Sequence, residues 1–158
     1  MHRALPLALA SLALAACTPG APAGKDAAAA TVQATGALCR PTPAGRQMTG
    51  CYLTLTATAD DRLMSVSSPA AGRTEIHESR IESNMMMMQE LKSGLPLPAG
   101  QPVELKPGGN HIMLLALSEP LEAGDTVALT LTFASSSPVE ITAAVGQPAI
   151  NDYGQATH

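Results

Sequence analysis

Apolar and polar residues alternate in several short runs along this chain. The clearest runs lie at 51–58, 126–133 and 139–145, and all three are rich in β-branched residues. Alternation with a period of two is typical of a strand that buries one face. The stretches TEIHESR and GGNHIMLLAL, at 74–80 and 108–117, are expected to carry further strands. The pattern therefore predicts a domain built from short strands.

Turn-forming residues separate these runs. Segments rich in Gly, Pro, Asp and Ser occur at 58–61, 67–72, 97–102, 106–110 and 118–125. Strands punctuated at this spacing predict an all-β fold, a sandwich or small barrel, over residues 31–146. The alternative is a mixed α+β domain with a helix over 81–92, because Met, Glu, Gln and Leu favour helices.

The N-terminal segment has the pattern of a secretory signal peptide over residues 1–16. MHRALPLALASLALAA places one cation before a small, apolar stretch and ends directly before Cys17. The Leu-Ala-Ala before Cys17 is similar to a bacterial lipobox. This similarity predicts that Cys17 is lipidated and that the lipid anchors the protein to a membrane. Thr18 favours the outer over the inner membrane. Plain secretion is the alternative.

Two further segments flank the predicted domain. Residues 17–30 are rich in Pro, Gly and Ala, a composition typical of a flexible tether. Residues 147–158 are expected to form a disordered tail of unknown role. Once the signal peptide is removed with Arg3, eight cations remain against thirteen acids. This acidic balance argues against a nucleic acid or an anionic membrane face as partner.

Two cysteines remain in the mature domain. Cys39 and Cys51 flank the turn-like RPTPAGRQMTG. Adjacent antiparallel strands would bring them within bonding distance, and an oxidising compartment would favour the bond. We therefore expect a disulfide, with two free thiols as the alternative.

Histidines and methionines carry the candidate chemistry. His111 and Met113 project from the same face of their strand, because strand side chains repeat every two residues. His77 lies on another strand, and the run Met85–Met88 follows on a segment without strong strand character. Imidazole with thioether is a ligand set that prefers Cu(I) over Zn, Mg or Ca. Thioethers also form no disulfides, which suits an oxidising compartment.

Simpler roles compete with ligation for each of these residues. A single Met can fill gaps in a core that has few aromatics, and a strand His is often hydrogen-bonded scaffold. Four consecutive methionines cannot all point inward from an extended segment, however. One or two of them are therefore expected to be exposed or to line a cleft.

The spacing His77-x10-Met88-x22-His111-x-Met113 resembles the motif H(M)x10Mx21HxM of the periplasmic PCuAC copper chaperones. LPLPAGQPVELKPGGNHIMLLAL and GCYLTLTATADDRLMSVSSPAAGRTEIHE extend the resemblance over about residues 32–145. It implies a cupredoxin-like Greek-key β-barrel and a Cu(I) site made by His77, Met88, His111 and Met113. It also implies a monomeric, non-catalytic carrier in the bacterial periplasm. This carrier would deliver copper toward the CuA centre of cytochrome c oxidase, alongside Sco-type thiol proteins.

The chain departs from the family motif at two places. Twenty-two residues separate Met88 from His111 where the family usually has twenty-one, so Met86 or Met87 could replace Met88 as ligand. Ser79 stands where the family often has methionine. The non-ligating methionines are interpreted as a soft rim that passes the ion to a partner, with hydrophobic cover as their alternative role.

Two other functions compete with copper transfer. A blue-copper electron-transfer site needs a cysteine thiolate beside its histidines, and neither Cys39 nor Cys51 is expected near His111. A metal-free scaffold or interaction lipoprotein would explain the altered spacing and Ser79. The sequence shows no nucleophile and base at a recognisable spacing, no phosphate loop and no metal hydrolase motif. We therefore do not expect an enzyme.

Overall fold

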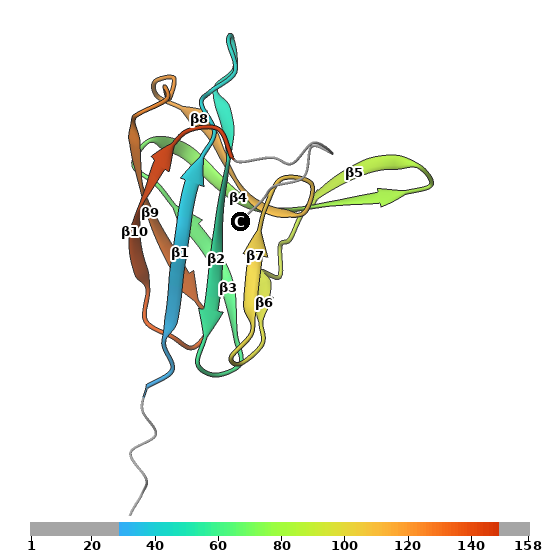
Figure 1. Ribbon diagram of the computed structural model, residues 1–158, viewed down its shortest axis with the longest axis vertical. Coiled ribbons are helices and arrows are strands. Elements are labelled where there is room, and N and C mark those ends of the chain that lie inside the picture. Colours follow the sequence, from blue (N-terminus) through green and yellow to red (C-terminus); the bar gives the residue numbers. More distant parts are fainter. Residues whose placement is uncertain (1–28, 149–158) are drawn as a thin grey trace, which may run out of the picture.

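The structure is a computed structural model that describes residues 29–148. The predicted signal peptide, Cys17, nearly all of the tether and the tail from residue 149, with His158, lie outside the described residues. Within the described part the chain forms strands β1 Val32–Cys39, β2 Met48–Ala57, β3 Asp61–Ser67, β4 Ala71–Glu82, β5 Met85–Glu90, β6 Leu95–Leu97, β7 Pro102–Leu105, β8 Asn110–Leu117, β9 Thr126–Phe133 and β10 Val139–Val145 (Figure 1).

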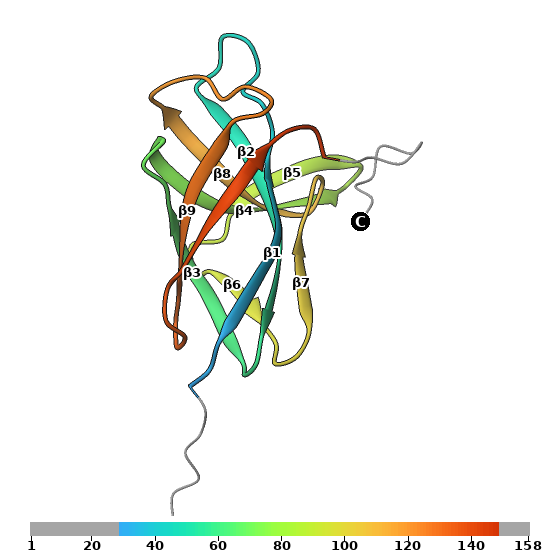
Figure 2. The same cartoon turned by 60° about the vertical axis from the view of Figure 1, so that its left-hand side comes forward.

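The all-β prediction is confirmed, and the helix considered over 81–92 is wrong. Residues 29–148 contain no helix, and so none of the described residues belongs to a helix able to span a membrane. The strands join one continuous hydrogen-bonded path in the order β5-β4-β8-β2-β1-β10-β9-β3-β6, while β7 pairs with β2. The path curls on itself, so that the strands enclose a common interior (Figures 1 and 2).

One hydrophobic core fills this interior. It is built by the inward-facing residues that the alternating pattern supplies: Leu53 and Leu55 of β2, Ile112 and Leu114 of β8, and Val127, Leu129, Leu131 and Phe133 of β9 are among its buried members. Because neighbouring residues on each strand point to opposite faces, burying these residues fixes which side chains point outward. The outer face of β2, β8 and β4 is thereby set by the core.

The methionine run forms a strand, which corrects the expectation of a segment without strong strand character. β5 pairs antiparallel with β4, from Glu82 opposite Met85 to His77 opposite Glu90. The two-residue turn Ser83–Asn84 has positive φ at both positions, as a type I′ hairpin turn requires. Pairing with the long strand β4 therefore outweighs the weak strand preference of the methionine run itself. This hairpin projects beyond the body of the domain (Figures 1 and 2).

Cys39 and Cys51 are bonded to each other across the β1–β2 pair. Both are fully buried, and Cys51 also pairs with Ile112 of β8. The bond therefore lies on the core face of β2, one residue away from positions that face outward.

Asp61 organises the loop after β9. Its carboxylate accepts hydrogen bonds from the backbone N–H groups of Ser135 and Ser136, each at 2.9 Å. Burial alone would raise the pKa of Asp61. Hydrogen bonds from Ser136 and from neighbouring backbone N–H groups outweigh this effect, and the pKa lies below its ordinary value of 3.8.

Candidate metal centre

Strand register brings the predicted ligands to one face of the sheet. His77 of β4 pairs directly with His111 of β8, and the rings have centroids 5.7 Å apart at 71° to each other. Met113 follows His111 by two residues and so shares its face. Met88 of β5 pairs with Ser79, which follows His77 by two residues. All four predicted ligands therefore lie on the outward face of β5, β4 and β8.

His111 presents one ring nitrogen to this face. Its side chain is buried, with 4% of the residue exposed, and its Nδ1–H donates to the carbonyl of Gly109 at 2.9 Å. That hydrogen bond holds the proton on Nδ1, so the lone pair of Nε2 is available to a metal. Burial lowers the pKa of His111, the Gly109 carbonyl opposes this, and the nearby His77 lowers it further. The lowered pKa favours the neutral imidazole, the form that ligates.

In His77 the two ring nitrogens have the opposite roles to those in His111: Nε2 lies against an acceptor, and Nδ1 does not. Its Nε2 lies 2.7 Å from a carboxylate oxygen of Glu75, whose other oxygen lies 2.9 Å from Nε of Arg73. Its Nδ1 is buried and has no hydrogen-bond partner among the described residues. Leaving a buried polar atom unpaired costs stability, so Nδ1 is the ring nitrogen of His77 that could accept a ligand. A carboxylate behind a ligating imidazole is a common way of orienting such a ring.

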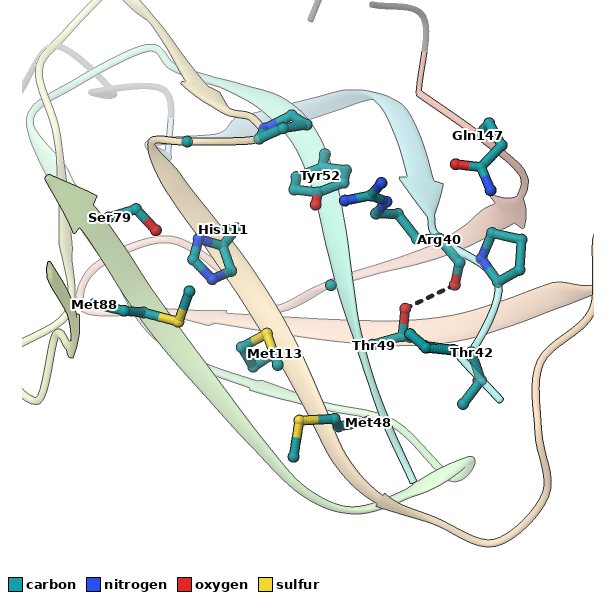
Figure 3. Close-up of a pocket in the computed structure, with 15 residues that line it drawn as sticks. Arg40, Thr42, Met48, Thr49, Tyr52, Ser79, Met88, His111, Met113 and Gln147 are labelled. Carbon is teal, nitrogen blue, oxygen red and sulfur yellow. Dashed lines mark hydrogen bonds between the residues drawn. The ribbon is translucent and has the colours of Figure 1, made fainter. Parts of the chain in front are cut away.

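The two thioethers complete a soft donor set. Met88 and Met113 line a pocket of about 630 Å³ together with His111, whereas His77 is not among the residues that line it. Figure 3 shows the sulfur atoms of both methionines beside the His111 ring. Met87 pairs with Arg80 and so faces the other side of the hairpin, whereas Met86 shares the face of Met88 but lies farther toward the tip. Of the candidates in the run, Met88 alone lines this pocket.

The methionine run is not core filler. All four of its residues are exposed, and Met88 has 55% of its surface accessible. The described residues contain no group of three or more His, Cys, Asp and Glu arranged to hold a metal. Two imidazoles with two thioethers on one face would match the ligand preference of a soft monovalent ion.

Three residues beside the ligands were not singled out from the sequence. Glu75 precedes His77 by two residues on the same strand face, which is a signal that strand periodicity offers. Met48 of β2 lines the same pocket, and so does Tyr52. Gly50 lies between them opposite Met113, and the Tyr52 hydroxyl is 3.2 Å from where a Cβ at this glycine would be. The hydroxyl therefore occupies space that any larger residue at Gly50 would fill.

Comparisons with known proteins agree with this architecture. The copper-bound PCuAC domain from PmoF2 matches with a TM-score of 0.60 and 24% identity, over 74% of this chain and 93% of that domain. The solution structure of Cu(I)-bound DR1885 from Deinococcus radiodurans matches with a TM-score of 0.55 and 26% identity, over 78% of this chain and 82% of that protein. The prediction of a cupredoxin-like all-β fold is confirmed.

Sequence comparison identifies the family. The putative lipoprotein Lxx21020 from Leifsonia xyli subsp. xyli is 43% identical over 81 residues, which make up 50% of this chain. The match spans about half of that relative, 49% of its length. The model of the family described as "Putative lipoprotein LpqE-like" matches residues 22–145, which is most of the chain. The chain therefore belongs to the LpqE-like lipoprotein family.

Proposed function

We propose that this protein binds Cu(I) as cargo outside the cytoplasm and hands it to an acceptor protein. The proposed ligands are His77, Met88, His111 and Met113. One observation carries the proposal: in the cross-strand pair of imidazoles, one nitrogen of each ring is held by an acceptor, and the buried Nδ1 of His77 has no hydrogen-bond partner among the described residues. Two thioethers lie on the same face.

The donor set suits a carrier of Cu(I). Four neutral ligands leave the single positive charge of Cu(I) uncompensated, and the Glu75 carboxylate behind His77, which Arg73 also contacts, offsets part of it. Cys39 and Cys51 are bonded to each other on the core side of the sheet, so neither supplies the thiolate that a blue-copper site needs. Ligand exchange is therefore favoured over electron transfer.

The position of the site suits transfer. Met88 is exposed on a projecting hairpin while His111 is buried behind it. An acceptor's ligand can therefore approach the ion from the thioether side and displace the outer ligand first. We propose a CuA subunit of cytochrome c oxidase or a Sco-type thiol protein as the acceptor or donor, and no catalytic chemistry for this protein.

Membership of a lipoprotein family supports a lipid anchor at Cys17. The tether 17–30 would then hold the copper domain near a membrane surface facing the periplasm, with the outer membrane as the proposed location. A single acyl chain binds a membrane only marginally, so a stable anchor needs a second chain or another membrane-binding feature.

The test is an anaerobic titration of the mature protein with Cu(I) against a competing chromogenic chelator. We expect one tightly held equivalent for the wild type and for Met64→Leu, an exposed methionine on β3 that lies outside the pocket. His111→Ala and Met113→Leu are expected to release the ion to the chelator. Circular dichroism checks that each variant is folded. A wild type that holds no equivalent would instead support the metal-free scaffold.

A further inference from the structure

A third thioether borders the pocket, beyond the four ligands proposed above. Met48 lies at the start of β2 and lines the pocket together with Met88 and Met113. Figure 3 shows the three methionines along one side of the pocket, with Met113 between the other two. Nothing in the proposed ligand set uses Met48.

The sheet register explains how Met48 comes to this place. Gly50 pairs with Met113, and Met48 precedes Gly50 by two residues, so both methionines point to the same face. Met48 is therefore the diagonal cross-strand neighbour of Met113, a separation within reach of long side chains. Gly50 has no side chain, and the space beside it is bordered by the Tyr52 hydroxyl. A flexible thioether at this position can approach an ion held by Met113.

Packing does not account for Met48. It has 41% of its surface exposed, although it neighbours a core that buries most large apolar residues. Met64 provides the comparison within the same chain, because it is exposed to a similar extent, 44%, but lies on β3 outside the pocket. Exposure alone therefore does not distinguish the two residues, but location beside the candidate ligands does.

We propose that Met48 is a further thioether ligand that shares the soft ion with Met113 at a second position, displaced from the histidines toward β2. The ion would move between the two positions by exchange of one donor at a time, with Met113 bound in both. The second position would give an incoming donor or acceptor access to an ion already separated from the buried imidazole of His111. This inference rests on the proposed function.

The first test uses Ag(I), a redox-inert monovalent ion of the same softness, with protein labelled at the methionine ε-methyl groups. Spectra are recorded by proton–carbon NMR from zero to two equivalents. We expect the methyl signals of Met48, Met88 and Met113 to shift, while that of Met64 stays in place. The second test measures the rate at which a chelator removes Cu(I) from Met48→Leu and Met64→Leu. Removal is expected to slow by about tenfold only in Met48→Leu, the lower end of what neighbouring residues do to metal sites.

The outcomes separate the two proposals. If Met88 and Met113 shift but Met48 does not, or if the two leucine variants lose Cu(I) at equal rates, the second position is refuted and the four-ligand site stands. If the signals of Met88 and Met113 also stay in place, the proposed function itself fails. Leucine retains the volume and apolar character of methionine, so both variants are expected to fold.

Discussion

Replacing Gly94 by Ala is expected to destabilise the domain far more than the same change at Gly100. Both glycines have positive φ, of 78° and 71°, so the backbone penalty for an L-residue is common to both. A Cβ at Gly94 would lie 2.4 Å from the carbonyl oxygen of Leu63, which belongs to strand β3, whereas a Cβ at Gly100 meets nothing within 4 Å. The pair therefore isolates the effect of steric contact with β3, since a Cβ at Gly94 would also meet Arg62 Cγ at 3.1 Å.

The expected losses of stability follow from the backbone penalty and the steric contact. Left-handed backbone costs an L-residue about 1–2 kcal/mol, and the stiffer unfolded chain of the alanine variant returns roughly 0.4–1 kcal/mol. Gly100→Ala should therefore lose between roughly 0 and 1.6 kcal/mol. Gly94→Ala must also push the β5–β6 connection away from β3, and such overpacking typically adds about 1–3 kcal/mol.

Urea unfolding followed by circular dichroism measures both variants beside the wild type. We expect equal m-values and a midpoint that falls clearly more for Gly94→Ala. The reasoning is refuted if the two variants have the same free energy of unfolding within about 0.5 kcal/mol, the scatter of ordinary surface substitutions. In that case the connection after the methionine hairpin would be free to move away from β3.

Three further predictions concern the site and the fold. Glu75→Gln removes the charge behind His77 and is expected to weaken Cu(I) binding about tenfold, measured by chelator competition, without a matching loss of thermal stability. Met88→Leu should lower Cu(I) affinity in the same assay, whereas Met87→Leu, on the opposite face of β5, should leave it unchanged. Asp61→Asn should reduce the free energy of unfolding at neutral pH. Because the folded-state pKa of Asp61 is lowered, this contribution is present above 3.8 and is lost as pH falls below it, so urea midpoints of wild type and variant should converge in acid.

Alternation predicted the strands that bury one face regularly. The segments 126–133 and 139–145 coincide with β9 and β10, and 51–58 overlaps β2. The short strands β6 and β7 gave no such signal, because each has few residues and includes a proline. The β5 strand also could not be predicted locally, since its pairing with β4 decides its conformation.

In the candidate site too, relations within one strand could be predicted from the sequence, and relations between strands could not. Local periodicity was enough to place His111 beside Met113, because that relation lies within one strand. The direct pairing of His77 with His111 depends on the β4–β8 register, which no local pattern contains. The same two-residue rule also places Glu75 on the face of His77. Met48 required knowledge that β2 is the next neighbour of β8.

The projecting methionine hairpin also carries a chemical liability. Thioethers that a partner can touch are equally open to peroxide and other oxidants, which convert methionine to its sulfoxide. The sulfoxide is polar and no longer offers the unmodified thioether to a soft ion. Under the proposed function, oxidation of these outermost methionines would lower the capacity to hold the ion, whereas the buried imidazole of His111 is less accessible to oxidants.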